Sequence, residues 1–174
     1  MKISFKNSQS RSDILKKVSE LSINERQCVA IICFERYCRK NKIVHKDIEV
    51  FIEHVWKVVQ IEKNFCEWAE KFGQLIITGQ CDPFPEDLIK SIPPNLFNEF
   101  NSLVSCVYET SATCWYAAES EDSSKMLIEI FEIISKHCIP IPDISFYRDS
   151  SKKSPDGWTP SVSQEKLNIW RSTV

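Results

Sequence analysis

The sequence predicts an all-α protein: a single-domain bundle of about seven to eight helices packed as antiparallel hairpins, with an irregular C-terminal tail. Only 3 of the 174 residues are glycine, whereas sheet-rich proteins of this size usually need more glycine for turns and bulges. Apolar residues make up 43% of the chain, enough for a full core, and they recur at helical spacings of three and four. We therefore expect one helical domain over residues 1–174.

Two N-terminal capping patterns predict where the first helices begin. Ser10 with Asp13, and Ser22 with Glu25, have the spacing of a capping box. In this motif each of the two side chains bonds to a backbone N–H group that the first turn would otherwise leave without a partner. We expect one helix to start at each of these two boxes.

The second helix is predicted to lie at the centre of the bundle and to run to about Asn41. Its residues 28–34 are apolar on every side, so they must be enclosed by other elements. A buried strand is the alternative for such a run. The capping box before it and the charged residues after it favour a helix.

The same periodicity predicts the elements that follow. Residues 47–60 and 65–76 place apolar side chains three and four positions apart, and Gly79 is expected to end the second of these helices. Residues 81–85 form a loop. Pro85 can start a short helix, because the first turn of a helix does not need the N–H group that proline lacks.

The C-terminal half is predicted to contain a long helical hairpin and then the tail. Pro94 is placed to open the longest helix, which runs to Glu119, and a further helix follows to about His137. The tail covers residues 139–162, which are rich in Pro, Ser and Lys. A short terminal helix is expected over residues 163–171.

The capping of this terminal helix is also predicted. Ser161 and Gln164 have the spacing of a capping box, so they are expected to form its start. The apolar Leu167 and Trp170 would then return to the core.

The formal net charge of −2 hides a strong asymmetry along the chain. Residues 61–145 contain 5 Lys/Arg against 14 Asp/Glu, a balance of −9, while residues 1–60 contain 12 against 7. A block this acidic would repel nucleic acid and anionic lipid and attract a basic partner. We therefore expect neither nucleic acid nor a membrane among the partners, and the oligomeric state stays open.

Cysteine usage and motif searches predict neither a metal nor a cofactor. The first thirteen residues contain no apolar secretory segment, so we expect a cytoplasmic protein whose eight cysteines are mostly thiols. No CxxC spacing occurs, which argues against zinc. Three scattered glycines cannot build a phosphate-binding loop, and no catalytic motif is present. The sequence therefore predicts no catalytic residues and no enzyme.

Some polar residues nevertheless have a functional alternative. Cys38 and His54 could form a nucleophilic dyad, but no orienting group or oxyanion donor can be identified, so packing roles are favoured. Glu35 and Arg36 follow the apolar run and are expected to pair with charges on another helix. His137 can offset a helix dipole. A third reading is an enzyme that uses Glu and His side chains in a helical pocket, and a pocket that holds Glu35 and His54 within hydrogen-bond reach of each other would favour it.

The feature that bears most on function is a group of carboxylates in the hairpin of residues 95–137. They are predicted to line its outer face and tip, where a basic partner would bind, with one tyrosine as an aromatic anchor. An ordinary solvated face is the alternative. The predicted partner-binding residues are Glu109, Tyr116, Glu119, Glu121, Asp122, Glu129 and Glu132.

One resemblance adds to this reading of the residues. The stretch ERQCVAIICFERYCR at residues 25–39, followed by residues 45–58 with their FIEHVW core, resembles small helical bacterial proteins. It is similar to immunity proteins of polymorphic toxin systems, including contact-dependent growth inhibition. The resemblance covers about a fifth of the chain.

The resemblance implies a cytoplasmic antitoxin that binds its cognate toxin and blocks the toxin's active site. Toxins of this kind are often basic nucleases, to which an acidic block would be complementary. A non-enzymatic helical adaptor or regulator that binds a basic cellular partner is the alternative, because it would share the fold and the acidic surface. No binding residue is transferred from the family.

Overall fold

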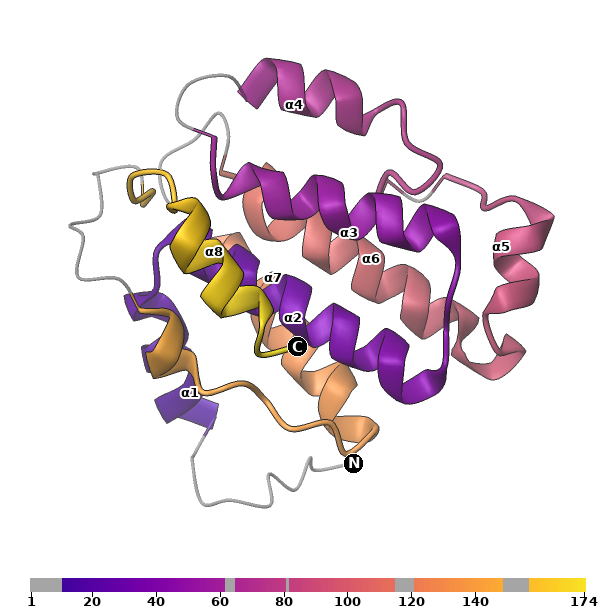
Figure 1. Ribbon diagram of the computed structural model, residues 1–174. Helices are drawn as coiled ribbons and strands as arrows, with labels where there is room; N and C mark the ends of the chain where they lie inside the picture. The colour runs from indigo at the N-terminus through magenta and orange to yellow at the C-terminus, as the bar shows by residue number, and fades with distance from the viewer. Residues whose placement is uncertain (1–10, 62–64, 81, 115–120, 149–156) are drawn as a thin grey trace.

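The computed structural model describes residues 11–61, 65–80, 82–114, 121–148 and 157–174. These residues form eight α-helices, two 3₁₀ helices and no strand, so the predicted all-α class and number of helices are confirmed (Figure 1). None of the described helices combines the length and apolarity needed to cross a membrane. The α-helices are α1 (Arg11–Glu20), α2 (Ile23–Asn41), α3 (Lys46–Val58), α4 (Phe65–Phe72), α5 (Glu86–Ser91), α6 (Phe97–Ala112), α7 (Glu121–Lys136) and α8 (Gln164–Arg171), and the 3₁₀ helices are η1 (Pro94–Leu96) and η2 (Ile144–Tyr147).

Helix α2 lies at the centre of the fold, as predicted. Its residues 28–34 are all buried, and α3, α6 and α7 pack against it. In Figure 1, α8 crosses in front of α2 and α7 lies behind it. The predicted capping box is present: the Ser22 hydroxyl accepts a hydrogen bond from the Glu25 N–H, and the Glu25 carboxylate accepts one from the Ser22 N–H.

Helices α6 and α7 form the predicted antiparallel hairpin. Near the end of α6, the carbonyl of Thr110 accepts a 2.6 Å hydrogen bond from Ser123 in the first turn of α7. At the opposite end, Glu99 in the first turn of α6 bonds to His137, which directly follows α7. The two helices therefore run in opposite directions and are fastened at both ends.

Aromatic rings fill the core beside the second half of α2. Phe34 of α2 contacts Phe51 of α3 and Phe100 of α6, with ring centroids 5.6 Å apart in both pairs. Phe51 also contacts Phe72 of α4 at 5.9 Å. Burying a phenylalanine stabilises a fold by about 1.5–3 kcal/mol, so these rings join four helices strongly.

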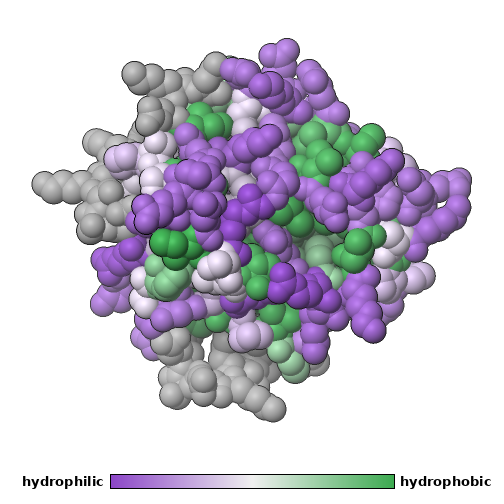
Figure 2. All heavy atoms as spheres, in the orientation of Figure 1, coloured by the Kyte–Doolittle hydropathy of each residue, from purple (hydrophilic) through white to green (hydrophobic). Residues whose placement is uncertain are grey.

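The hydrophilic and hydrophobic residues are mixed on the face that carries α3 and α8. Figure 2 shows its hydrophobic residues as separate patches between hydrophilic ones. Val50 of α3 and Ile169 of α8 are among the exposed apolar side chains, at 51% and 50% exposure. Single exposed apolar residues are normal on a protein surface, so we assign no partner to this face.

Two predicted helix ends are wrong. Helix α4 ends at Phe72 rather than at Gly79, because the Gly73 N–H closes the last turn on Ala69 and the chain then turns. Leu75 and Ile76 therefore lie outside the helix although their spacing continues its period. Gly79 belongs to a later turn, where it takes the left-handed conformation with φ of 67°.

The hairpin's first helix is also shorter than predicted. Pro94 opens the 3₁₀ helix η1, which leads into α6, and α6 ends after 16 residues at Ala112. The longest described helix is α2, with 19 residues. Glu119, where this helix was expected to end, lies outside the described residues.

The capping of the terminal helix is a further correction. Helix α8 is capped by Ser163, whose hydroxyl accepts a hydrogen bond from the Lys166 N–H, whereas Gln164 is its first residue. The expected pairing of Ser161 with Gln164 is therefore wrong. Ser10, expected to cap the first helix, lies outside the described residues. Leu167 and Trp170 do return to the core.

The cysteines in the described part of the chain are all free thiols, as expected. Burial raises the pKa of the Cys106 thiol to about 12, so this group stays protonated at neutral pH. Two of the described thiols, Cys66 and Cys138, are exposed. The buried ones are Cys28, Cys33, Cys38, Cys106 and Cys114.

Gly79 provides a test of the turn that follows α4. An added Cβ at Gly79 would lie 2.5 Å from the Cβ of Tyr108, and its φ of 67° is unfavourable for any side chain. Gly79→Ala is therefore expected to lower the free energy of unfolding by about 2–4 kcal/mol, measured by urea denaturation.

Gly73→Ala is the matched control. Its added Cβ would meet only backbone oxygens at ordinary distances of 3.6 and 3.7 Å. This variant should change stability by less than about 1 kcal/mol. Equal losses for the two alanine variants would contradict the described turn.

Candidate functional site

A concave surface over α7 is the candidate site, and we call it the α7 groove. It has a volume of about 500 Å³ and is formed by α7, the first turns of α6 and one residue of α1. Its lining residues are Lys125, Ile128, Glu129, Glu132, Ile133 and Lys136 of α7, Asn98, Glu99 and Ser102 of α6, and Leu15 of α1.

The helical period of α7 explains why one helix serves both the core and the groove. Its inner stripe, formed by Leu127, Ile130, Phe131 and Ile134, is buried. Residues three and four positions apart on the opposite side share a face and line the groove. Ile128 and Ile133 at its floor are only 7% and 5% exposed, whereas Leu15 at its edge is 42% exposed. The groove therefore has an apolar floor.

The rim of the α7 groove carries more negative than positive charge. Lys125 lies 2.8 Å from Asp122, and Lys136 lies 3.9 Å from Glu99, so each lysine is neutralised by a carboxylate. Glu129 and Glu132 add two further carboxylates. The lining residues thus carry three carboxylates against two lysines, a formal charge of −1, and Asp122 beside the groove brings the balance to −2.

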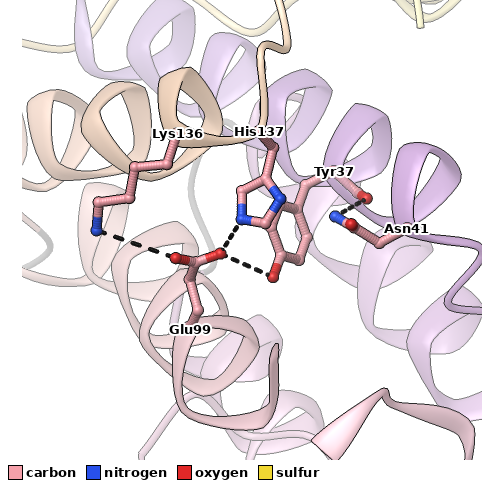
Figure 3. A network of polar contacts seen from close by, with 5 residues as sticks. All are labelled: Tyr37, Asn41, Glu99, Lys136 and His137. Atoms are coloured by element: carbon pink, nitrogen blue, oxygen red, sulfur yellow. Dashed lines mark hydrogen bonds and ion pairs between the residues drawn. The ribbon is translucent and has the colours of Figure 1, made fainter. Parts of the chain in front are cut away.

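Glu99 is the centre of a polar network at one end of the groove (Figure 3). The Tyr37 hydroxyl of α2 donates a 3.0 Å hydrogen bond to Oε1 of Glu99, and the ring of His137 bonds to the same oxygen. Lys136 approaches the other oxygen. Burial, and then the nearby Glu99, raise the pKa of Tyr37, so its hydroxyl remains a donor. One carboxylate thus joins α2, α6 and the end of α7.

This network was not predicted from the sequence. Glu99 and His137 are 38 residues apart, and Tyr37 is 62 residues from Glu99. His137 was expected only to offset the dipole of its own helix, but it also bonds to a carboxylate on α6. No local spacing signals such a contact, because it depends on the alignment of the hairpin.

The structure brings some of the predicted binding residues together. Glu129 and Glu132 line the groove, and Glu121 and Asp122 are exposed at the start of α7. Glu109 is half-buried on α6, and burial raises the pKa of its carboxyl group. The remaining two predicted residues, Tyr116 and Glu119, lie outside the described residues.

Glu129 lies close to a buried thiol of the core. Burial, and then the nearby Glu129 carboxylate, raise the pKa of the Cys106 thiol of α6. The thiol therefore stays protonated beside this carboxylate.

The charged pair that follows the apolar run of α2 has separate partners. Glu35 accepts a 2.7 Å hydrogen bond from the indole N–H of Trp56, and burial raises the pKa of its carboxyl group. The positive charge of Arg171 on α8 lowers the pKa of the same carboxyl group. Arg36 donates to the carbonyls of Thr173 and Pro140, at 2.6 and 3.3 Å. These contacts hold the C-terminal segment against α2.

His54 has a packing role between α3 and α4. Its ring stacks on Trp68 with centroids 4.8 Å apart, and its Nε2 lies 3.1 Å from the Trp68 carbonyl. Burial lowers the pKa of His54, which favours the neutral ring, and burial raises the pKa of the Cys38 thiol. Glu35 bonds to Trp56 whereas His54 bonds to Trp68, so the Glu35–His54 hydrogen bond that would favour the enzyme reading is not formed.

Tyrosine-to-phenylalanine variants test the Glu99 network. Tyr37→Phe removes a hydrogen bond to a carboxylate and is expected to cost about 1.5–3 kcal/mol of unfolding free energy in urea at pH 7. Tyr147→Phe is the matched control, because the Tyr147 hydroxyl lies 2.6 Å from the neutral hydroxyl of Thr173. It should cost about 0.5–1.5 kcal/mol. A loss for Tyr37→Phe no larger than the control would show that Glu99 does not depend on this phenol.

Comparisons with known proteins identified no relative of this chain. No family model matches the chain, and neither a curated protein nor a solved structure is significantly similar to it. A function for this chain therefore has to be inferred from the α7 groove, its charges and the network at its end.

Proposed function

We propose that this protein is a non-enzymatic, cytoplasmic immunity protein that neutralises a basic, nuclease-type toxin by covering the toxin's active site. The observation that carries the proposal is the α7 groove, a concave surface with an apolar floor and three carboxylates against two lysines in its lining. The resemblance of residues 25–39 and 45–58 to immunity proteins supports the same class of function.

The groove has the two properties that a protein-binding surface needs. Its carboxylates would attract a basic partner over about 8 Å at physiological ionic strength and raise the association rate. Its apolar floor of Ile128 and Ile133, with Leu15 at the edge, would supply contact area after encounter. Charge alone would give speed and salt sensitivity, whereas apolar contact slows dissociation.

The Glu99 network would also favour tight binding. It fixes the first turn of α6 to the end of α7 and to α2, so this end of the groove has one arrangement before a partner arrives. A surface that is already ordered loses less conformational entropy on binding than a mobile one. Such preorganisation suits an inhibitor that must bind a toxin stoichiometrically.

Co-expression tests the proposed function directly. The product of the gene immediately upstream is expected to stop growth when expressed alone. This chain should restore growth and co-purify with that product in a stable complex. A harmless upstream product, or one that this chain neither binds nor blocks, would contradict the proposal. Binding of a basic cellular protein without protection would favour the alternative function of a helical adaptor.

Charge reversal tests whether the α7 groove is the binding surface. Glu129→Lys combined with Glu132→Lys is expected to lower the association rate with the toxin at least about ten-fold at low salt and to flatten its salt dependence. Glu121→Lys with Asp122→Lys should act in the same direction. Stopped-flow kinetics at several ionic strengths measures both effects, and a thermal melt should show a nearly unchanged Tm.

The matched control reverses two carboxylates away from the groove. Glu67 of α4 and Glu86 of α5 are exposed and form i,i+4 pairs with Lys71 and Lys90. Glu67→Lys with Glu86→Lys makes the same change in net charge as the groove variant. If this control slows association as much as the groove variant does, the effect comes from net charge and the groove is not the interface.

A further inference from the structure

Buried polar residues gather at one end of the core, around the start of α2. Ten polar or charged residues are buried in the described part of the chain, and only His54 and Thr78 lie elsewhere. We call the other eight the polar layer. They are Ser22, Asn24, Glu25, Arg26 and Gln27 at the start of α2, Thr110 and Ser111 of α6, and Ser123 of α7.

Most hydrogen-bonding groups of the polar layer have partners within the protein. The Arg26 guanidinium donates to the Val18 and Ser19 carbonyls, at 3.1 and 3.3 Å. The hydroxyls of Thr110 and Ser123 donate to backbone carbonyls of α6, at 2.7 and 2.6 Å. Buried polar groups in proteins are nearly always paired, so an unpaired atom in this layer indicates a partner from outside the chain.

Three side-chain oxygens of the polar layer have no hydrogen-bond partner, namely Oδ1 of Asn24, Oε1 of Gln27 and Oγ of Ser111, and the last two belong to the facing helices α2 and α6. Gln27 and Ser111 are 0% and 1% exposed, and neither Oε1 of Gln27 nor Oγ of Ser111 has a hydrogen-bond partner. Nε2 of Gln27 donates a 3.0 Å bond to the carbonyl of Val107. Ser111 is one helical turn beyond Val107, on the same face of α6. Helix geometry therefore places Ser111 on the face of α6 that the Gln27 amide contacts.

Rotating the Gln27 amide by 180° would not resolve this. The rotation would place Oε1 against the Val107 carbonyl, so two acceptors would face each other and the bond from Nε2 would be lost. Leaving a buried acceptor without a donor costs about 1–3 kcal/mol. The contact therefore needs a small donor that can reach Oε1 while Nε2 keeps its present bond.

We propose that an internal water molecule is bound between Gln27 and Ser111. It donates one hydrogen bond to Oε1 of Gln27 and accepts one from the Ser111 hydroxyl, which satisfies both oxygens. Proteins hold about one buried water per 27 residues, typically in polar places of this kind. The site is separate from the α7 groove and does not depend on the proposed function.

Overhauser transfer from water to the ¹⁵N-labelled full-length protein tests the proposal. The Gln27 side-chain amide protons should give a cross peak to water with the sign of a molecule that tumbles with the protein. Gln60 is an internal control, because its amide bonds to Gln164 at the exposed surface. Its cross peak should have the sign of transient hydration.

A crystal structure of the full-length protein separates a bound water from exchange through the serine hydroxyl, which could relay magnetisation. Density within hydrogen-bond distance of both oxygens supports the water, whereas a direct Ser111–Gln27 bond refutes it. Absence of the Gln27 cross peak to water in solution would also overturn the proposal.

Discussion

The buried side chains from Cys28 to Phe34 leave this stretch of α2 without a face that water can solvate. A helix of this kind is stable only when other helices enclose it, and removing its apolar area from water is the main free-energy gain of the fold. Helices α3, α6 and α7 supply that enclosure, and α8 is held against it by the contacts of Arg36. The positions of the other elements, and therefore of the α7 groove, follow from this requirement.

Those parts of the fold that depend on local chemistry could be predicted from the sequence. The Ser22–Glu25 box and the periodic stripe of α7 involve residues three or four positions apart, so the sequence states them directly. The end of α4 could not be predicted in this way. The apolar spacing continues past Phe72, and only the tertiary turn decides that the helix stops there.

The residues of the candidate site also fall into two groups, those that the sequence predicts and those that only the fold brings together. Glu129 and Glu132 could be selected from the sequence because they are acidic residues on one amphipathic helix. Glu99 could not, because its role comes from Tyr37 and His137, which the fold brings from distant parts of the chain. The same carboxylate borders the groove and ties three elements together, so the binding surface and the scaffold share a residue that neither composition nor spacing identifies.

The two halves of the core differ in what holds them together. Around Phe34 the contacts are aromatic, whereas around Gln27 polar side chains donate hydrogen bonds to backbone carbonyls. Local opening costs least where few apolar contacts have to be broken. Backbone amides along α2 should therefore exchange with solvent deuterium in a graded way, and the last to exchange should be those beside the aromatic rings. Local unfolding would begin around Gln27, whereas the part of the core around Phe34 would open only in global unfolding.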